Sequence, residues 1–413
     1  MSNTSSVNSV STKDKVQWLI VFICALMFAG FVCSRALVSI SMIALVVMSA
    51  VFYGAEMKRS YFQRKEFWIL SVFFWLVLLS GVYSDDKADW QNWVRIKLPF
   101  LFLPLAFAPV KKLSEEKFTA LLYSFVLVFF VSTVFVLVRY AINYQTVTQS
   151  FLAGQGIKMP YSHIRYSLML AFSFFCCVYL LEKKLFLFSR SEKWLQIFLL
   201  VFSFAALHVL SVRSGLLALY LGILFLLLRF VFVKRNFGLA LTVVALLFAT
   251  MYTAINFVPT LKNKIAYMKY DVAGLSANDV NYHYDAMRIV SMKAAFEVWQ
   301  QNKIIGCGAG DLKTEMQTAY ARILPDLKPE NYLLPHSQLM WVLASLGAVG
   351  LALFLFAFFF PLVYKSNYRQ PLLVVLYIII FSSFFTEAGL EEQMGTGFFL
   401  VWLLILLNQN QHD

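Results

Sequence analysis

Residues 214–233 read SGLLALYLGILFLLLRFVFV, a run in which Arg229 is the only charged residue. About 20 consecutive apolar residues are what a helix needs to cross the hydrocarbon core of a bilayer. Similar runs recur along the chain, and the alternating pattern of an outer-membrane barrel is absent. Because only helices satisfy all of their own backbone groups in lipid, the sequence predicts an all-α, polytopic membrane protein.

Composition agrees with this fold class. Of the 413 residues, 60% are hydrophobic, 14% are charged and 42 are Phe, which is more apolar surface than a soluble domain of this length can bury. The net charge of +13 is spread mostly over short loops between apolar runs, so no basic face for nucleic acid is expected. The five cysteines have no metal-ligand spacing and do not predict a disulfide framework.

Twelve apolar runs are candidate membrane spans. They are 16–33, 36–54, 67–83, 94–110, 118–138, 166–181, 194–210, 214–233, 237–258, 337–364, 371–386 and 396–407. The fourth contains three prolines, which predict a kinked or partly inserted helix, and the twelfth needs preceding residues to reach full length. The first has no small-residue cleavage site and is expected to be retained.

The distribution of Lys and Arg predicts the orientation of these spans. With the N-terminus inside, the inner segments carry about twice as many Lys and Arg as the short outer ones, as the positive-inside rule requires. This indicates an N-in/C-in protein of a bacterial inner membrane, with a disordered cytoplasmic N-terminus at 1–15 and a cytoplasmic tail at 408–413. Omitting span four would invert every later loop, so the charges also favour that span.

Residues 259–336 form the one long hydrophilic stretch, and the charge distribution places it in the periplasm. Loops of this length are usually functional. An amphipathic helix is expected at 284–301, with Arg288 and Trp299 on one face that could lie on the membrane surface. A glycine-rich turn follows at 306–310 and is interpreted as bringing backbone amides near a partner. A second short helix is expected from about Asp311.

His336 is the first candidate for chemistry. It follows Pro335, which suits the first turn of a helix, and it directly precedes an apolar span. The positive end of a helix dipole disfavours imidazolium and attracts phosphate, so a neutral ring would be available as a base beside an anion. An interfacial histidine that merely caps the helix is the alternative.

Arg213 and Arg288 are the candidate anion ligands. Arg213 stands between two long apolar spans, and Arg288 lies on the loop helix. An arginine in such a position pairs, binds an anion or extends to the lipid headgroups. If they share one outer site with His336, a lipid diphosphate is the ligand that their charge favours.

Four further residues are candidates for substrate binding: Arg139, His163, Arg165 and Glu387. The first three cluster around the third outer loop and add positive or protonatable groups. Glu387 lies at the end of an apolar run, where it could pair with an arginine or act as a base. Asp85 and neighbouring Asp86 could hold a divalent ion, but no third ligand is specified, and a solvated loop is the alternative.

The order of three motifs resembles the O-antigen ligase family, which includes O-antigen polymerases and protein O-oligosaccharyltransferases. Ser-Val-Arg-Ser-Gly at 211–215 resembles the family's element at the start of a span. Ile-Ile-Gly-Cys-Gly-Ala-Gly at 304–310 and Pro-His-Ser-Gln-Leu at 335–339 follow in the family's order. The chain departs from the family at Val212, which interrupts the usual Ser-Arg pair, and at Ser337, where Asn is commoner. The resemblance covers residues 211–355.

The resemblance implies a multi-spanning glycosyltransferase that works without a metal or cofactor from an undecaprenyl pyrophosphate donor. Arg213 and Arg288 would then stabilise the departing diphosphate, and His336 would activate or orient the acceptor, for which lipid A–core is expected. An O-antigen polymerase, a protein O-oligosaccharyltransferase and a transporter remain alternatives. The transporter fits less well, because outside the fourth span only His208 and Arg229 fall within spans, and the long loop has no counterpart in the first half.

Overall fold

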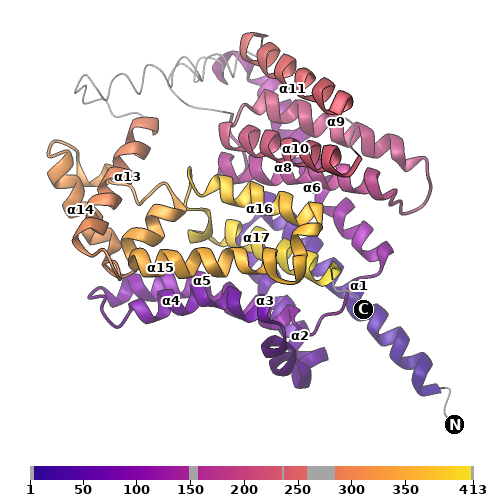
Figure 1. Ribbon diagram of the computed structural model, residues 1–413, viewed down its shortest axis with the longest axis horizontal. Coiled ribbons are helices and arrows are strands. Elements are labelled where there is room, and N and C mark those ends of the chain that lie inside the picture. Colours follow the sequence, from indigo (N-terminus) through magenta and orange to yellow (C-terminus); the bar gives the residue numbers. More distant parts are fainter. Residues whose placement is uncertain (1–3, 148–156, 235–236, 258–283, 411–413) are drawn as a thin grey trace.

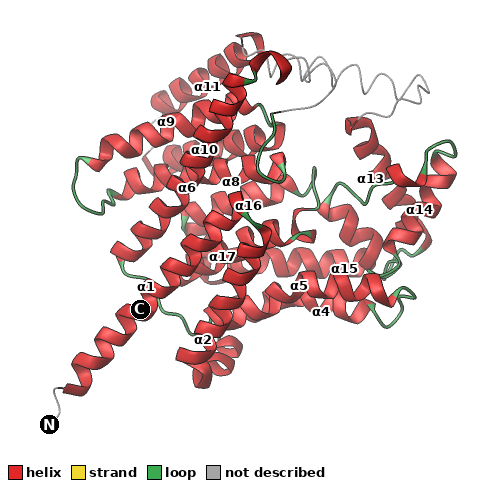
Figure 2. Ribbon diagram, turned by 180° about the vertical axis from the view of Figure 1, so that it is seen from behind, coloured by secondary structure: helices red, strands yellow, loops and turns green. Residues whose placement is uncertain are grey.

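Long helices make up most of the computed structural model of the chain (Figure 1). The structure describes residues 4–147, 157–234, 237–257 and 284–410. Within these ranges the regular elements are α-helices and short 3-10 helices, with no strand, which confirms the all-α prediction (Figure 2).

Short connections join many of the neighbouring helices in the described part of the chain. The first half contains α1 (Thr4–Cys33), α2 (Arg35–Gln63), α3 (Lys65–Trp68), η1 (Ile69–Ser71), α4 (Val72–Ser80), α5 (Lys87–Phe107), α6 (Glu115–Ile142), α8 (His163–Lys183) and α9 (Glu192–Leu210). The second half contains α10 (Arg213–Lys234), α11 (Phe237–Phe257), α13 (Tyr284–Gln301), α14 (Leu312–Ile323), η2 (Pro329–Asn331), α15 (Gln338–Val363), η3 (Tyr364–Arg369), α16 (Pro371–Ser383), η4 (Gly389–Glu391) and α17 (Gln393–Gln409). Helix α1 begins within the segment for which the sequence predicted disorder.

Seven helices in the described part of the chain are long and apolar enough to cross a membrane. They are Asp14–Cys33, Arg35–Gln63, Glu115–Ile142, His163–Lys183, Glu192–Leu210, Arg213–Val233 and Gln338–Arg369. The predicted third span is divided among α3, η1 and α4, and α16 and α17 are shorter apolar helices. The chain is therefore a multi-pass membrane protein, whereas the count of twelve spans and their orientation remain predictions.

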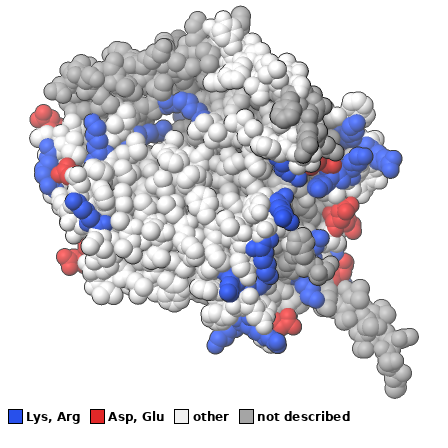
Figure 3. Space-filling view, viewed as in Figure 1, with Lys and Arg blue, Asp and Glu red and all other residues white. Residues whose placement is uncertain are grey.

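The outer surface of the bundle is apolar, which fits lipid contact. Helix α2 exposes Ile40, Ile43, Val47 and Val51, which are 55–71% exposed and lie on one face at helical spacing. Figure 3 shows the same property on a larger scale, because a broad uncharged area separates Lys and Arg side chains at the left and right edges of the face. A soluble helix would turn such a stripe inward.

Helix α17 lies at the centre of the bundle, where residues 394–408 are all buried. The ring of Trp402 lies 5.2 Å from that of Phe28 and 5.1 Å from those of Phe125 and Phe172, measured between centroids. These rings come from α1, α6 and α8, so α17 is surrounded by protein rather than lipid. This explains why the last apolar run can be shorter than a lipid-exposed span.

Two short helices of the predicted long loop, α13 and α14, lie at one end of the bundle, where α4, α5 and α15 also end (Figures 1 and 2). Helix α13 has the predicted bounds, and α14 begins directly after Asp311 as expected. The buried face of α13, which includes Val290, Ala294 and Val298, packs on α14 and α15. The helix is therefore held by protein contacts. The first part of the loop, up to residue 283, lies outside the described residues.

Candidate active site

Several helix ends meet around the segment 384–392, which connects α16 to α17. Ser337 Oγ and the Gln338 backbone N–H, at the start of α15, donate to the carbonyl oxygen of Phe384 over 2.8 and 2.9 Å. The start of α10 touches the start of α8, because a Cβ added at Gly215 would lie 2.5 Å from Cβ of Ser167. The starts of α8, α10 and α15 thus lie at the same end of the bundle, and a helix N-terminus favours anions.

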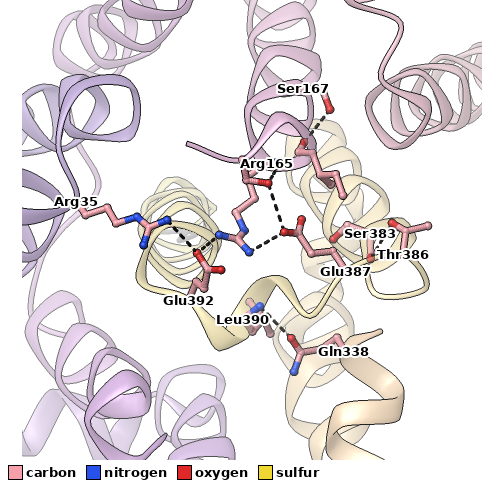
Figure 4. Close-up of polar contacts among 11 residues, drawn as sticks. Arg35, Arg165, Ser167, Gln338, Ser383, Thr386, Glu387, Leu390 and Glu392 are labelled. Carbon is pink, nitrogen blue, oxygen red and sulfur yellow. Dashed lines mark hydrogen bonds and ion pairs between the residues drawn. The ribbon is translucent and has the colours of Figure 1, made fainter. Parts of the chain in front are cut away.

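Arg165 is the centre of a partly buried ion-pair cluster (Figure 4). Its Nη2 lies 2.6 Å from Oε1 of Glu387, and its Nη1 contacts a carboxylate oxygen of Glu392. Glu392 Oε2 also lies 3.9 Å from Nη2 of Arg35, and Ser162 Oγ donates a 3.4 Å hydrogen bond to Glu387. Arg165 and Glu387 are each only 8% exposed, and a buried charge without its partner is costly. Arg165 is thus the arginine with which Glu387 pairs.

A small cavity borders this ion pair. It is lined by Arg165, Leu168, Met169, Ile380, Ser383, Phe384, Glu387, Gly389, Leu390, Gly395 and Phe398. Its volume of ≈ 20 Å³ suits a single water molecule and excludes a sugar.

Arg288 and His336 act on one another across the contact between α13 and the start of α15. The backbone N–H of His336 donates to Ser291 Oγ over 3.3 Å, and Ser291 Oγ donates to the carbonyl oxygen of Arg288 over 2.7 Å. Burial, together with the positive charge of Arg288, lowers the pKa of His336 to about 4. The imidazole is therefore neutral at pH 7 beside a permanently charged guanidinium group.

The carboxyl group of Glu387 lies within the influence of two guanidinium groups. Burial raises its pKa, and the charges of Arg165 and Arg288 oppose that rise. Arg288 thus acts electrostatically on both His336 and Glu387. The structure brings four predicted residues together in this way, namely Arg165, Arg288, His336 and Glu387.

A break in α15 fixes the other end of α13. Gly347 has a φ of 68° and a ψ of −173°, which interrupts the helix. The segment 303–308 fills the gap: the N–H groups of residues 307 and 308 donate to the carbonyls of 344 and 345, and those of 348 and 349 donate to 303 and 304, over 2.9–3.1 Å. Irregular backbone at membrane depth is tolerated where protein satisfies it. The break in α15 is therefore the partner of the glycine-rich turn.

The remaining predicted residues occupy neighbouring helix ends. Arg213 and His163 are the first residues of α10 and α8, and both are exposed. Arg139 is exposed in the last turn of α6, which packs on α8. Asp85 and Asp86 donate their backbone N–H groups to the carboxylate of Asp311 over 2.7–2.9 Å. Across the described ranges, no three His, Cys, Asp or Glu side chains gather in a way that could hold a metal ion.

Sequence reasoning missed two residues of this region, Lys97 and Gln338. Both have no exposed surface, and both contact Glu391. A signal for Lys97 was present, because a lysine within an apolar run is costly unless it has a partner. Gln338 carried no such signal.

The fold and the site define a multi-pass, all-helical membrane protein with charged groups gathered at one end of its bundle. Residues 198–355 match the family model described as O-Antigen ligase, and no curated protein matches the chain. The match confirms the resemblance to the O-antigen ligase family that the motifs indicated. It covers Arg213, Arg288 and His336, and it indicates a membrane glycosyltransferase of the ligase or polymerase type.

Proposed function

We propose that this protein transfers an O-antigen glycan from undecaprenyl pyrophosphate to lipid A–core on the periplasmic side of the inner membrane, without a metal ion. The single observation that carries the proposal is the proximity of Arg288 and His336, whose backbones are joined through the hydroxyl group of Ser291 and which both lie within the residues that match the O-antigen ligase family. A fixed cation beside a neutral imidazole suits the transfer of a sugar from a diphosphate to a hydroxyl group.

The leaving group explains the need for arginine. When the bond between the anomeric carbon and the diphosphate oxygen breaks, its electron pair stays with the oxygen, and the diphosphate gains negative charge. Guanidinium groups that are already in place stabilise this charge without reorganising. Arg288 and Arg213, from the family-matched part of the chain, are proposed to hold the diphosphate in this step, and Arg139 and His163 to extend the positive surface.

The acceptor is proposed to meet His336. Its hydroxyl oxygen forms the new bond to the anomeric carbon as the diphosphate leaves, and the hydroxyl proton must go to a base. The lowered pKa of His336 keeps its ring neutral, so that a ring nitrogen can accept a hydrogen bond from the hydroxyl group and orient it. A base with a pKa of about 4 takes the proton only as the hydroxyl becomes acidic in the transition state.

Arg165 and Glu387, both predicted to bind substrate, are given a narrower role. The Arg165 guanidinium is occupied by two carboxylates, so it is proposed to neutralise them and prevent them from repelling the diphosphate. Glu387 is proposed to orient Arg288, because its carboxyl group interacts electrostatically with Arg288 as well as with Arg165.

The test is transfer by purified protein in lipid nanodiscs from a defined glycan-diphosphate lipid, with and without EDTA. Product in the presence of lipid A–core and EDTA supports the proposal. Elongated lipid-linked glycan, formed without lipid A–core, would instead identify a polymerase. The lipopolysaccharide of a deletion strain separates the same two functions, because loss of a ligase removes all attached chains and loss of a polymerase leaves a single repeat.

A further inference from the structure

Lys97 lies in the middle of α5 and has no exposed surface. Its Nζ lies 2.7 Å from Oε2 of Glu391 and donates a 2.6 Å hydrogen bond to the carbonyl oxygen of Leu390. The same nitrogen lies 4.6 Å from the ring centroid of Phe73 and 5.2 Å from that of Trp341. The ammonium group is therefore enclosed by a carboxylate, a carbonyl group and two aromatic rings.

Gln338 joins this buried group to the start of α15. Its Nε2 donates to Oε1 of Glu391 over 2.6 Å, and its Oε1 accepts from the backbone N–H of Leu390 over 2.9 Å. The side chain of Gln338 is fully buried, and residue 336, two positions earlier, is the histidine of the candidate site. One side chain thus ties the η4 segment to the part of the chain that carries His336.

The connection 384–392, which contains η4, also carries the carboxylates of the candidate site. Glu391 lies four residues after Glu387 and directly before Glu392. These two flanking residues, Glu387 and Glu392, are the partners of Arg165. The backbone around Leu390 is held by Lys97, Gln338 and the hydroxyl group of Thr396, which donates to the Leu390 carbonyl over 2.9 Å. A shift of Glu391 must therefore move both flanking carboxylates.

We infer that Lys97 is a positioning residue, whose buried ion pair with Glu391 sets the position of Glu387 and Glu392 relative to Arg165 and His336. The inference rests on the proposed transfer reaction and adds to it a residue that touches no reacting group. Ion pairing explains the placement of Lys97 without a bound substrate, because its contacts enclose it fully. Misplacing reacting groups by about 1 Å can cost on the order of 100-fold in rate.

The test compares Lys97→Met, Glu391→Gln and the double variant. Each single change leaves one buried polar or charged group without its partner, whereas the double change removes both charges at nearly unchanged volume. We expect each single variant to lower the maximal transfer rate per folded protein roughly 100-fold, with the donor KM little changed, and the double variant to recover at least about tenfold of that loss. Lys117→Met is the matched control.

Lys117 resembles Lys97 in being a buried lysine that pairs with a carboxylate, although the side chain of its partner Asp14 is 55% exposed. Lys117 is 3% exposed, pairs with Asp14 and has its Nζ 5.7 Å from the ring centroid of Trp18, but it lies in the first turn of α6. Its replacement should leave transfer unchanged. A double variant as inactive as Lys97→Met would overturn the inference in favour of direct substrate contact. Single variants with lowered yield but a wild-type rate per folded molecule would overturn it in favour of stability alone.

Hydrogen exchange measured by mass spectrometry tests the inference without activity. The amides of Gln338 and Leu390 are both hydrogen-bonded within this network, so Lys97→Met should speed their exchange and the double variant should slow it again. Unchanged exchange in Lys97→Met would refute the positioning role. Wild-type protein that shows this exchange pattern but no glycan transfer would refute only the proposed function.

Discussion

Replacing Gly347 with Ala is the sharpest perturbation of the anchor between the loop and α15. The φ and ψ of Gly347 fall in a region that is essentially restricted to glycine, and another residue there costs about 1–3 kcal/mol. The added Cβ would also lie 2.2 Å from the Ile304 carbonyl oxygen and 2.5 Å from the Gly306 nitrogen. Both are backbone atoms, so neither can turn away as a flexible side chain could.

The size of the effect follows from these contacts. Strain of about 1–3 kcal/mol and the loss of one of the four backbone hydrogen bonds, worth about 1 kcal/mol, add to about 2–4 kcal/mol. At about 1.4 kcal/mol per factor of ten, the paired amides of Cys307, Gly308, Ala348 and Val349 should exchange roughly 30- to 1000-fold faster. Transfer should fall as well, because α13 carries Arg288 and loses its fixed end.

The assay is hydrogen exchange and transfer measured on the same nanodisc preparation. Gly54→Ala is the control, because a Cβ there meets nothing within 4 Å and alanine favours the helix. Wild-type exchange and wild-type transfer in Gly347→Ala would show that the anchor does not position the site.

Three further predictions concern the ion pairs, the histidine and the η4 segment. Arg165→Met should destabilise the protein by about 3–5 kcal/mol, because Glu387 is left buried and unpaired. Adding Glu387→Gln to this variant should restore much of the melting temperature. Equal melting temperatures for wild type and Arg165→Met would refute the prediction. The His336 imidazole should stay neutral from pH 7.5 to 5 and protonate only as the pH falls through about 4, so its NMR chemical shift should be constant over the upper range. A titration midpoint near 6.5 would contradict the lowering of this pKa by burial and by the charge of Arg288. Gly395→Ala should lower transfer, because its Cβ would lie 2.1 Å from the Gly389 carbonyl oxygen, while Gly389→Ala, which meets nothing within 4 Å, should not; equal rates would argue against a fixed η4 segment.

The sequence predicted the parts of the fold that depend on local pattern. Helices α13 and α14 were found from amphipathic spacing and an N-terminal Asp, and most long apolar runs became single helices. The break in α15 was missed, because glycine at 347 is tolerated in a membrane helix and only the partner segment 303–308 shows why the helix opens. The central position of α17 depends on packing by helices far away in the sequence.

The candidate site likewise contains residues that the sequence could predict and pairings that it could not. His336 could be identified from its place at the predicted start of a span, and Arg288 from its place on the amphipathic loop helix. For Glu387 the sequence offered pairing with an arginine as one of two roles, the other being that of a base. Helix contacts that no local pattern encodes determine that Arg165 is the arginine that pairs with Glu387. Such contacts also bring Lys97 to Glu391, almost 300 positions away in the sequence.

The central claim is that Arg288 stabilises a departing diphosphate, and a single-turnover transfer measurement tests it most directly. Purified Arg288→Ala should transfer glycan on the order of 100- to 1000-fold more slowly than wild type at saturating donor. Arg95→Ala, which removes an exposed arginine in the first half of α5, should keep the wild-type rate. Equal product from Arg288→Ala and wild type would contradict the account.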